Sequence, residues 1–99
     1  MAEDTIELGG KIQLAGFRDL EPGKLIVVKK IVGNYVKKIE EQHSNFETIH
    51  IHLKSVHNSE FEIQVKALMG GQAQQAEVTD YNLFVALDKV LNRILTETA

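Results

Sequence analysis

The stretch that decides the fold is LIVVKKIVGNYVKKI, residues 25–39. Its first four residues are branched and its centre holds Gly33-Asn34, so a β-hairpin and a helix both compete for it. Polar and apolar residues do not alternate across Val27–Lys30, whereas the apolar residues of the whole stretch recur at helical spacing within an arc of about 100°. We therefore predict a helix, with Pro22 in its first turn and a cost of about 1 kcal/mol for Gly33 relative to alanine.

Alternating polar and apolar residues predict strands on both sides of this helix. The first strand covers Lys11–Phe17, with Ile12 and Leu14 on the same side. After the helix, Phe46–Val56 alternates in the same way. A turn at Asn58-Ser59 then lets the next alternating segment fold back, which predicts an antiparallel hairpin.

The C-terminal third of the chain adds an edge strand and a second helix. Gly70-Gly71 makes a turn, and the segment Gln72–Thr79 that follows is polar enough for the edge of a sheet. Thr79 or Asp80 is the expected cap of the last helix. The apolar face of that helix consists of Leu83, Phe84, Leu87, Val90, Leu91, Ile94 and Leu95.

This order of elements predicts an α+β fold, β-α-β-β-β-α, with a four-stranded mixed sheet and two helices packed on one face. Residues 11–99 would form this single domain, and the acidic residues 1–10 are expected to be a flexible N-terminal tail. The other face of the sheet would stay bare. Polar side chains would line it: Gln13, His50, His52, Lys54, Glu62, Gln64 and Lys66.

Composition excludes several classes of protein. The chain has 99 residues, 43% hydrophobic and 25% charged, which is typical of one soluble globular domain, and it has no cysteine for a disulfide or a thiolate metal site. No apolar run approaches the length of about 18 residues that a membrane span needs, and the acidic start is wrong for a signal or transit peptide. We therefore expect a cytoplasmic protein without a membrane partner. The net charge of −3 argues against a protein held to nucleic acid by bulk electrostatics alone.

Positive charge nevertheless gathers locally. Between residues 24 and 41 there are five lysines against Glu40 and Glu41. If the two helices pack side by side, their cations would form one strip that follows RNA phosphates by shape, and the alternative is an ordinary solvated helix face. The candidate RNA-binding residues are Lys29, Lys30, Lys37, Lys38, Lys89 and Arg93.

The two histidines on the strand after the first helix are the only metal candidates. His50 and His52 lie two apart and project side by side, as two ligands of zinc would. No third ligand stands at a known spacing, so histidines on an exposed sheet face are the competing interpretation. The sequence also lacks a nucleophile with its base, a paired-carboxylate motif and a phosphate-binding glycine loop. We expect a protein that is not an enzyme and needs no cofactor.

Three strings in the sequence resemble the ribosome hibernation promoting factor family, also called the ribosome-associated translation inhibitor or sigma-54 modulation family. Residues 12–16, IQLAG, are similar to its opening strand, and residues 28–40 to its first helix. Residues 82–88, NLFVALD, are similar to the family's Asp-Leu-Tyr-Ala-Ala-Ile-Asp. The similarity covers about residues 11–95. It implies a non-catalytic protein that occupies the tRNA and mRNA path of the small ribosomal subunit and idles translation under stress.

In this family basic residues on both helices face ribosomal RNA. The positions here that match are Lys29, Lys38 and, close to a family lysine, Arg93. The other candidates, Lys30, Lys37 and Lys89, rest on charge and facing alone. Thr96 stands where the family often has arginine, so the sequence resembles a divergent short form.

Two other functions stay open. The chain could be a protein-interaction module, or a homo-oligomer, that uses the bare sheet face or the edge strand at residues 72–79. It could also be an isolated double-stranded RNA-binding domain, which shares the final strand-strand-strand-helix order.

Overall fold

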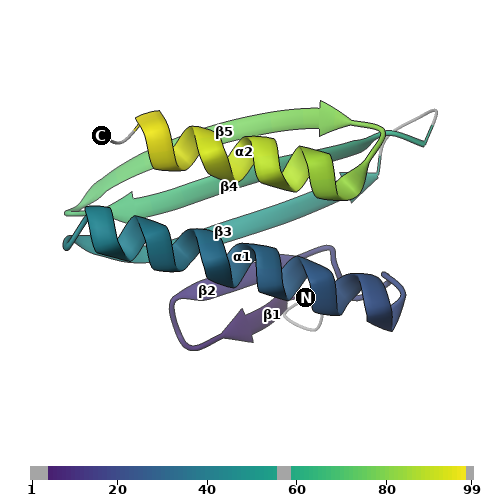
Figure 1. The fold of residues 1–99 in the computed structure, drawn as a ribbon, viewed down its shortest axis with the longest axis horizontal. Coiled ribbons are helices and arrows are strands. Elements are labelled where there is room, and N and C mark those ends of the chain that lie inside the picture. The colour runs from purple at the N-terminus through teal and green to yellow at the C-terminus, as the bar shows by residue number, and fades with distance from the viewer. Residues whose placement is uncertain (1–4, 56–58, 98–99) are drawn as a thin grey trace.

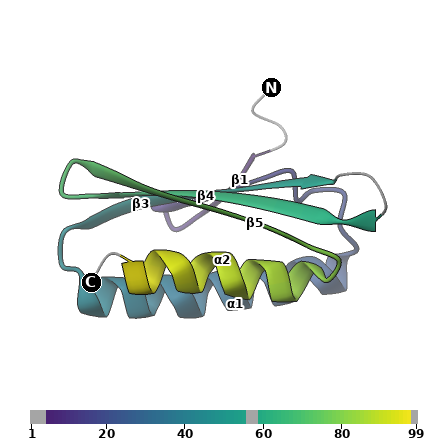
Figure 2. The same ribbon diagram turned by 90° about the horizontal axis from the view of Figure 1, so that it is seen from above.

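The computed structural model describes residues 5–55 and 59–97 of the chain. Their elements are β1 (Thr5–Leu8), β2 (Ile12–Ala15), α1 (Pro22–Gln42), β3 (Phe46–Ser55), β4 (Phe61–Met69), β5 (Gln72–Asp80) and α2 (Leu83–Glu97). The strands lie in the order β1-β2-β3-β4-β5 (Figure 1). β2 and β3 are parallel across the α1 crossover, and the other neighbours are antiparallel. Both helices cover one face of the sheet (Figure 2), so the predicted α+β class and its two layers are confirmed.

The prediction of four strands in the order β-α-β-β-β-α is wrong at its N-terminal end, because the sheet has five strands. Thr5–Leu8, which we placed in the acidic tail, form β1 and pair antiparallel with β2. Gly9 and Gly10 take positive φ values of 63° and 78° and so make the tight turn between these strands. Ile6 and Leu8 pack against the core, which explains why so short a segment joins the sheet.

α1 runs without interruption from Pro22 to Gln42, so the helical interpretation of residues 25–39 is confirmed. It buries Val28, Val32, Val36 and Ile39 against the sheet. A Cβ atom added at Gly33 would meet nothing within 4 Å. Close packing therefore does not require this glycine, and it only weakens the middle of the helix.

The core lies between the helices and the sheet, and the described part of the chain buries no polar side chain in it. Strand residues enter it in the predicted phase, including Leu14 of β2 and Ile51 of β3. Gly16 ends β2 at a φ of 83°, and a Cβ atom there would collide with the carbonyl oxygen of Leu53. The predicted turn at Asn58-Ser59 begins outside the described residues.

The cap of α2 differs from the prediction. Asn82 Oδ1 accepts hydrogen bonds from the amides of Phe84 at 2.9 Å and Val85 at 3.1 Å, so Asn82 is the cap rather than Thr79 or Asp80. Asp80 instead accepts a hydrogen bond of 3.0 Å from the amide of Asn82, in the turn that precedes α2. β5 lies at the edge of the sheet, as predicted. Neither helix, over its described residues, is long and apolar enough to cross a membrane.

Candidate nucleic-acid interface

The two helices run parallel over the sheet and begin at the same end of the molecule (Figure 1). The hydroxyl of Tyr35 on α1 donates a hydrogen bond of 2.5 Å to Asp88 on α2. The ammonium group of Lys38 lies 5.2 Å from the centroid of the Tyr35 ring, within cation–π range. These contacts identify the sides of α1 and α2 that face each other.

The hydrogen bond between the helices also changes the acidity of the phenol. Burial of the ring, then the hydrogen bond and the negative charge of Asp88, raise the pKa of Tyr35 from 10.0 to about 12. Tyr35 is therefore a neutral hydrogen-bond donor throughout the physiological pH range, and Asp88 keeps its partner.

Four lysines of α1 carry charge that the described residues do not neutralise. Lys29, Lys30, Lys37 and Lys38 are exposed, and none forms an ion pair within the described part of the chain. Glu40 of the same helix forms its ion pair, at 3.3 Å, with Lys11, which lies outside the helix. The charge of these four lysines is therefore not neutralised by an ion pair within the described residues.

These four lysines spread over the exposed half of the helix. Lys38 lies on the α2 side, next to Tyr35. Lys29 lies about three turns before Glu40, and so on the side of α1 that Lys11 contacts. Lys30 and Lys37 are two turns apart and face away from the buried valines. Together they form what we call the α1 lysine surface: Lys29, Lys30, Lys37 and Lys38.

The other two predicted RNA-binding residues are engaged elsewhere. Lys89 Nζ binds Asp80 Oδ2 at 3.1 Å, and Arg93 Nη1 donates to the backbone carbonyl of Glu77 at 3.1 Å. Both partners belong to β5, whereas Asp88 marks the side of α2 that faces α1. The structure therefore places the four candidate lysines of α1 on the exposed half of one helix but does not join Lys89 and Arg93 to them in a single strip.

Asp80 is the acidic partner in this second group. The amide of Asn82 and then the ammonium group of Lys89 lower the pKa of the Asp80 carboxyl below its usual value of 3.8, because both stabilise the charged form. Lys89 thus belongs to a local network that fixes the start of α2 to the end of β5.

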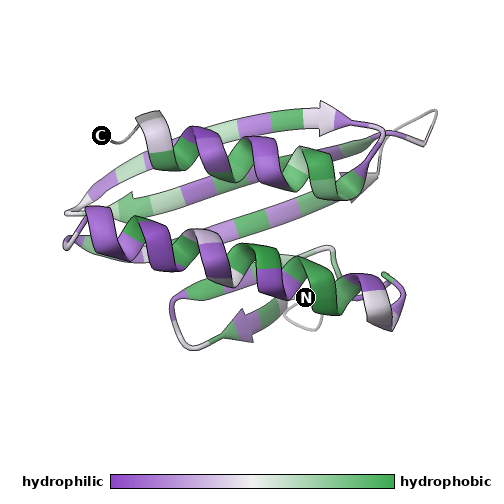
Figure 3. Ribbon diagram, in the orientation of Figure 1, coloured by the Kyte–Doolittle hydropathy of each residue, from purple (hydrophilic) through white to green (hydrophobic). Residues whose placement is uncertain are grey.

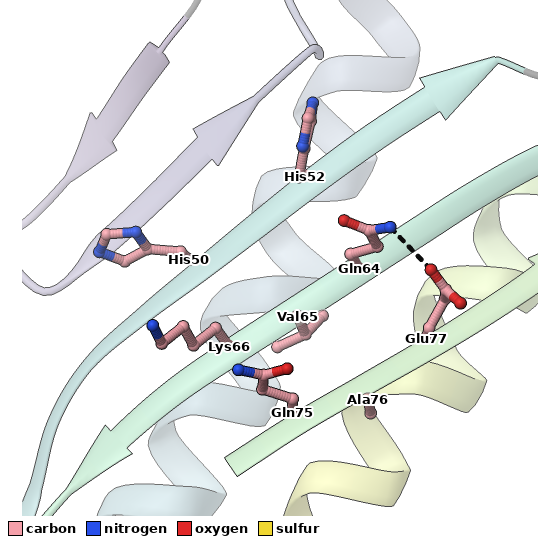
Figure 4. Close-up of a pocket in the computed structure, with 8 residues that line it drawn as sticks. All are labelled: His50, His52, Gln64, Val65, Lys66, Gln75, Ala76 and Glu77. Carbon is pink, nitrogen blue, oxygen red and sulfur yellow. Dashed lines mark hydrogen bonds between the residues drawn. The ribbon is translucent and has the colours of Figure 1, made fainter. Parts of the chain in front are cut away.

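The predicted histidine pair lies on the uncovered face of the sheet. His50 and His52 are exposed, and they line a hollow of about 550 Å³ together with Gln64, Lys66, Gln75 and Glu77. Their imidazole rings lie apart and point in different directions (Figure 4). Lys66 stands opposite His50 in the register of β3 and β4, and places a cation beside it. In residues 5–55 and 59–97, no group of three His, Asp or Glu residues is arranged to hold a metal ion.

Sequence reasoning missed a second hollow, of about 180 Å³, where α1 and α2 begin. It is lined by Lys24, Phe61, Tyr81, Asn82, Leu83 and Phe84. The signal for it in the sequence was the turn at Gly70-Gly71, which pairs the segment after Ser59 with the edge strand. In the structure this pairing sets Phe61 opposite Asp80, and so beside the start of α2.

Neither a protein-family model nor a curated protein sequence matches this chain. Among solved structures, it is similar to a ribosomal subunit interface protein from Coxiella burnetii, with a TM-score of 0.67 and 11% identity over 88% of this chain and 89% of the other. It is also similar to the N-terminal domain of Thermus thermophilus Protein Y, with a TM-score of 0.62 and 17% identity over 93% and 94% of the two chains. The resemblance seen in the sequence is thus confirmed at the level of the fold, which this chain shares with both proteins.

Proposed function

We propose that this protein is a cytoplasmic, non-catalytic ribosome-associated protein that binds ribosomal RNA of the small subunit and idles translation under stress by occupying the path of tRNA and mRNA. The observation that carries the proposal is the α1 lysine surface, four exposed cations without an ion-pair partner in the described chain. The shared fold with a ribosomal subunit interface protein supports the same conclusion.

The chemistry of this surface suits phosphate rather than base recognition. Ammonium groups on flexible stems act as point charges, and they bind phosphate oxygens without reading sequence. The chain as a whole carries a net charge of −3, so its remaining surface is repelled by RNA. This asymmetry would orient the molecule with α1 toward the ribosome during the encounter.

Co-sedimentation with small ribosomal subunits at low and high salt tests the proposal. We expect Lys30→Gln with Lys37→Gln to weaken binding roughly 10- to 100-fold near 0.1 M salt, and to reduce the slope of log affinity against log salt by about 1.5, as for two lost phosphate contacts. The matched control is Lys54→Gln with Lys66→Gln, which removes the same charge from the uncovered sheet face.

Two outcomes would contradict the proposal. One is wild-type protein that does not bind small subunits at low salt. The other is an equal loss of affinity in both double variants, because binding would then depend on the net charge of the protein and not on the position of the lysines on α1.

The uncovered sheet face favours a second function, a protein-interaction module. No helix of the described chain covers this face, and its hollow is lined by uncharged as well as charged side chains. A pull-down with and without nuclease separates the two functions, because a protein partner held by this face survives the removal of RNA. In that case Lys54→Gln with Lys66→Gln, rather than the α1 variant, would reduce capture.

Self-association through β5 is the remaining form of this alternative. Arg93 donates to the Glu77 carbonyl of this edge strand, so one backbone acceptor of β5 is already in use. Light scattering of the purified chain at increasing concentration tests whether β5 still pairs with a second copy.

A further inference from the structure

The hollow where the two helices begin is lined mainly by aromatic and aliphatic side chains. Three of the six aromatic residues of the chain line it, although they come from separate places in the sequence: Phe61, Tyr81 and Phe84. Tyr81 is 67% exposed, an unusual state for a tyrosine that a core could have buried. We call this site the helix-start hollow.

Large hydrophobic residues are exposed around the same end of the molecule. In the described chain the large hydrophobic side chains left exposed are Ile26, Val27, Tyr81 and Val85. They lie in the second turn of α1, just before α2 and in the first turn of α2. Figure 3 shows hydrophobic residues at the start of α2 and just after the start of α1. Of these four, only Tyr81 lines the helix-start hollow, so it is the exposed apolar side chain available to a ligand there.

One cation accompanies this apolar surface. Lys24 lines the hollow, and its ion pair with Glu21 is long, at 3.6 Å, and exposed, so it contributes little and is readily exchanged for another anion. Glu21 makes no capping hydrogen bond with α1. Pro22 has no amide hydrogen, so the amides without a side-chain acceptor at this positive end of the helix dipole are those of Gly23 and Lys24.

We propose that the helix-start hollow binds one unpaired nucleobase of RNA, stacked on Tyr81, with the adjoining phosphate at Lys24 and the start of α1. The inference rests on the proposed function and adds a base contact to the phosphate contacts of the α1 lysine surface. A nucleotide has a flat π face that stacks on an exposed aromatic ring and a negative phosphate that binds a cation. Tyr81 offers the ring and Lys24 the cation. An apolar protein side chain would use the aromatic ring but make no contact with the charge of Lys24.

The test measures binding of the full chain to a short single-stranded oligouridine by fluorescence anisotropy. We expect Tyr81→Ala to weaken binding about 5- to 150-fold, as for one lost stacked base, and Tyr81→Phe to bind like the wild type. An oligonucleotide of the same length without bases should bind equally to wild type and Tyr81→Ala. Val85→Ala, an exposed residue of α2 that does not line the hollow, is the matched control.

The same variants on small ribosomal subunits separate this inference from the proposed function. If Lys30→Gln with Lys37→Gln weakens subunit binding and Tyr81→Ala does not, the phosphate contacts stand and the base contact is wrong. If Tyr81→Ala weakens subunit binding but not oligouridine binding, the hollow contacts a ribosomal protein and the inference is overturned. If oligouridine binding depends on Tyr81 but small subunits are not bound at all, the hollow stands and the ribosomal function fails.

Discussion

The hydrogen bond from Tyr35 on α1 to Asp88 on α2 joins the sides of the two helices that face each other. Tyr35 is partly buried and packs against the core on its other side. Burial of Val28, Val32, Val36 and Ile39 against the sheet directs the lysines outward. The Tyr35–Asp88 contact joins this layer to α2 beside the α1 lysine surface.

Replacement of Tyr35 by Phe should lower the free energy of unfolding by about 1 kcal/mol, the usual net value of one such hydrogen bond. The pKa of Tyr35 is raised to about 12 in the folded protein, so the associated stability is present below pH 10 and lost as pH rises toward 12. Urea unfolding at neutral pH and titration of the tyrosinate absorbance measure the two effects. Asp88→Asn should move the titration of Tyr35 back toward pH 10, and an unchanged titration would contradict the role of the carboxylate.

Gly33→Ala and Gly16→Ala should have opposite effects on stability. At Gly33 the added methyl group meets no neighbour and alanine favours the helix, so we expect a gain of about 0.5–1 kcal/mol. At Gly16 the same change meets a positive φ of 83° and the backbone oxygen of Leu53, so we expect a loss larger than that gain. Thermal unfolding of both variants checks the pair. A destabilising Gly33→Ala would mean that the middle of α1 packs differently.

Asp80 should contribute to the acid sensitivity of the fold. Its pKa is lowered in the folded state, first by the amide of Asn82 and then by Lys89. The stabilisation is therefore present above the unfolded pKa of about 3.8 and lost as pH falls through the lower folded value. Asp80→Asn should be less stable than wild type at neutral pH, with a difference that narrows under acid conditions. Urea midpoints across this range measure it, and a constant difference would refute the assignment.

Lys89→Gln with Arg93→Gln should affect stability more than ribosome binding. Both side chains are engaged with β5, so their loss should lower the free energy of unfolding by about 1 kcal/mol. We expect the affinity for small subunits to fall less than about threefold, although this pair removes as much charge as Lys30→Gln with Lys37→Gln. Co-sedimentation of the two double variants side by side checks this. Equal losses of affinity would mean that Lys89 and Arg93 contact the subunit as the lysines of α1 do.

Local pattern predicted most of the fold because most of its elements are long and strongly periodic. The helical spacing of Val28, Val32 and Val36 overcame the turn signal at Gly33, since burial of three valines outweighs the cost of one glycine. β1 escaped prediction because it has four residues and only two apolar side chains, Ile6 and Leu8, within an acidic segment. Pairing with β2, rather than local preference, makes it a strand.

The candidate site was predictable in its residue types but not in its grouping. Sequence identified the lysines of α1, yet it could not show that Lys89 and Arg93 are bound to β5, because those contacts depend on how α2 packs across the sheet edge. The helix-start hollow escaped for a similar reason. Phe61 and Tyr81 are 20 positions apart in the chain, and the register of β4 with β5 brings them together.

The placement of both helices on one side gives the molecule two unlike surfaces, one rich in lysine and one nearly balanced in charge (Figure 2). A copy anchored through α1 would turn the strand surface, with its imidazole and amide groups, toward the surrounding solution. A second partner could then reach this strand surface while the first stays bound to α1.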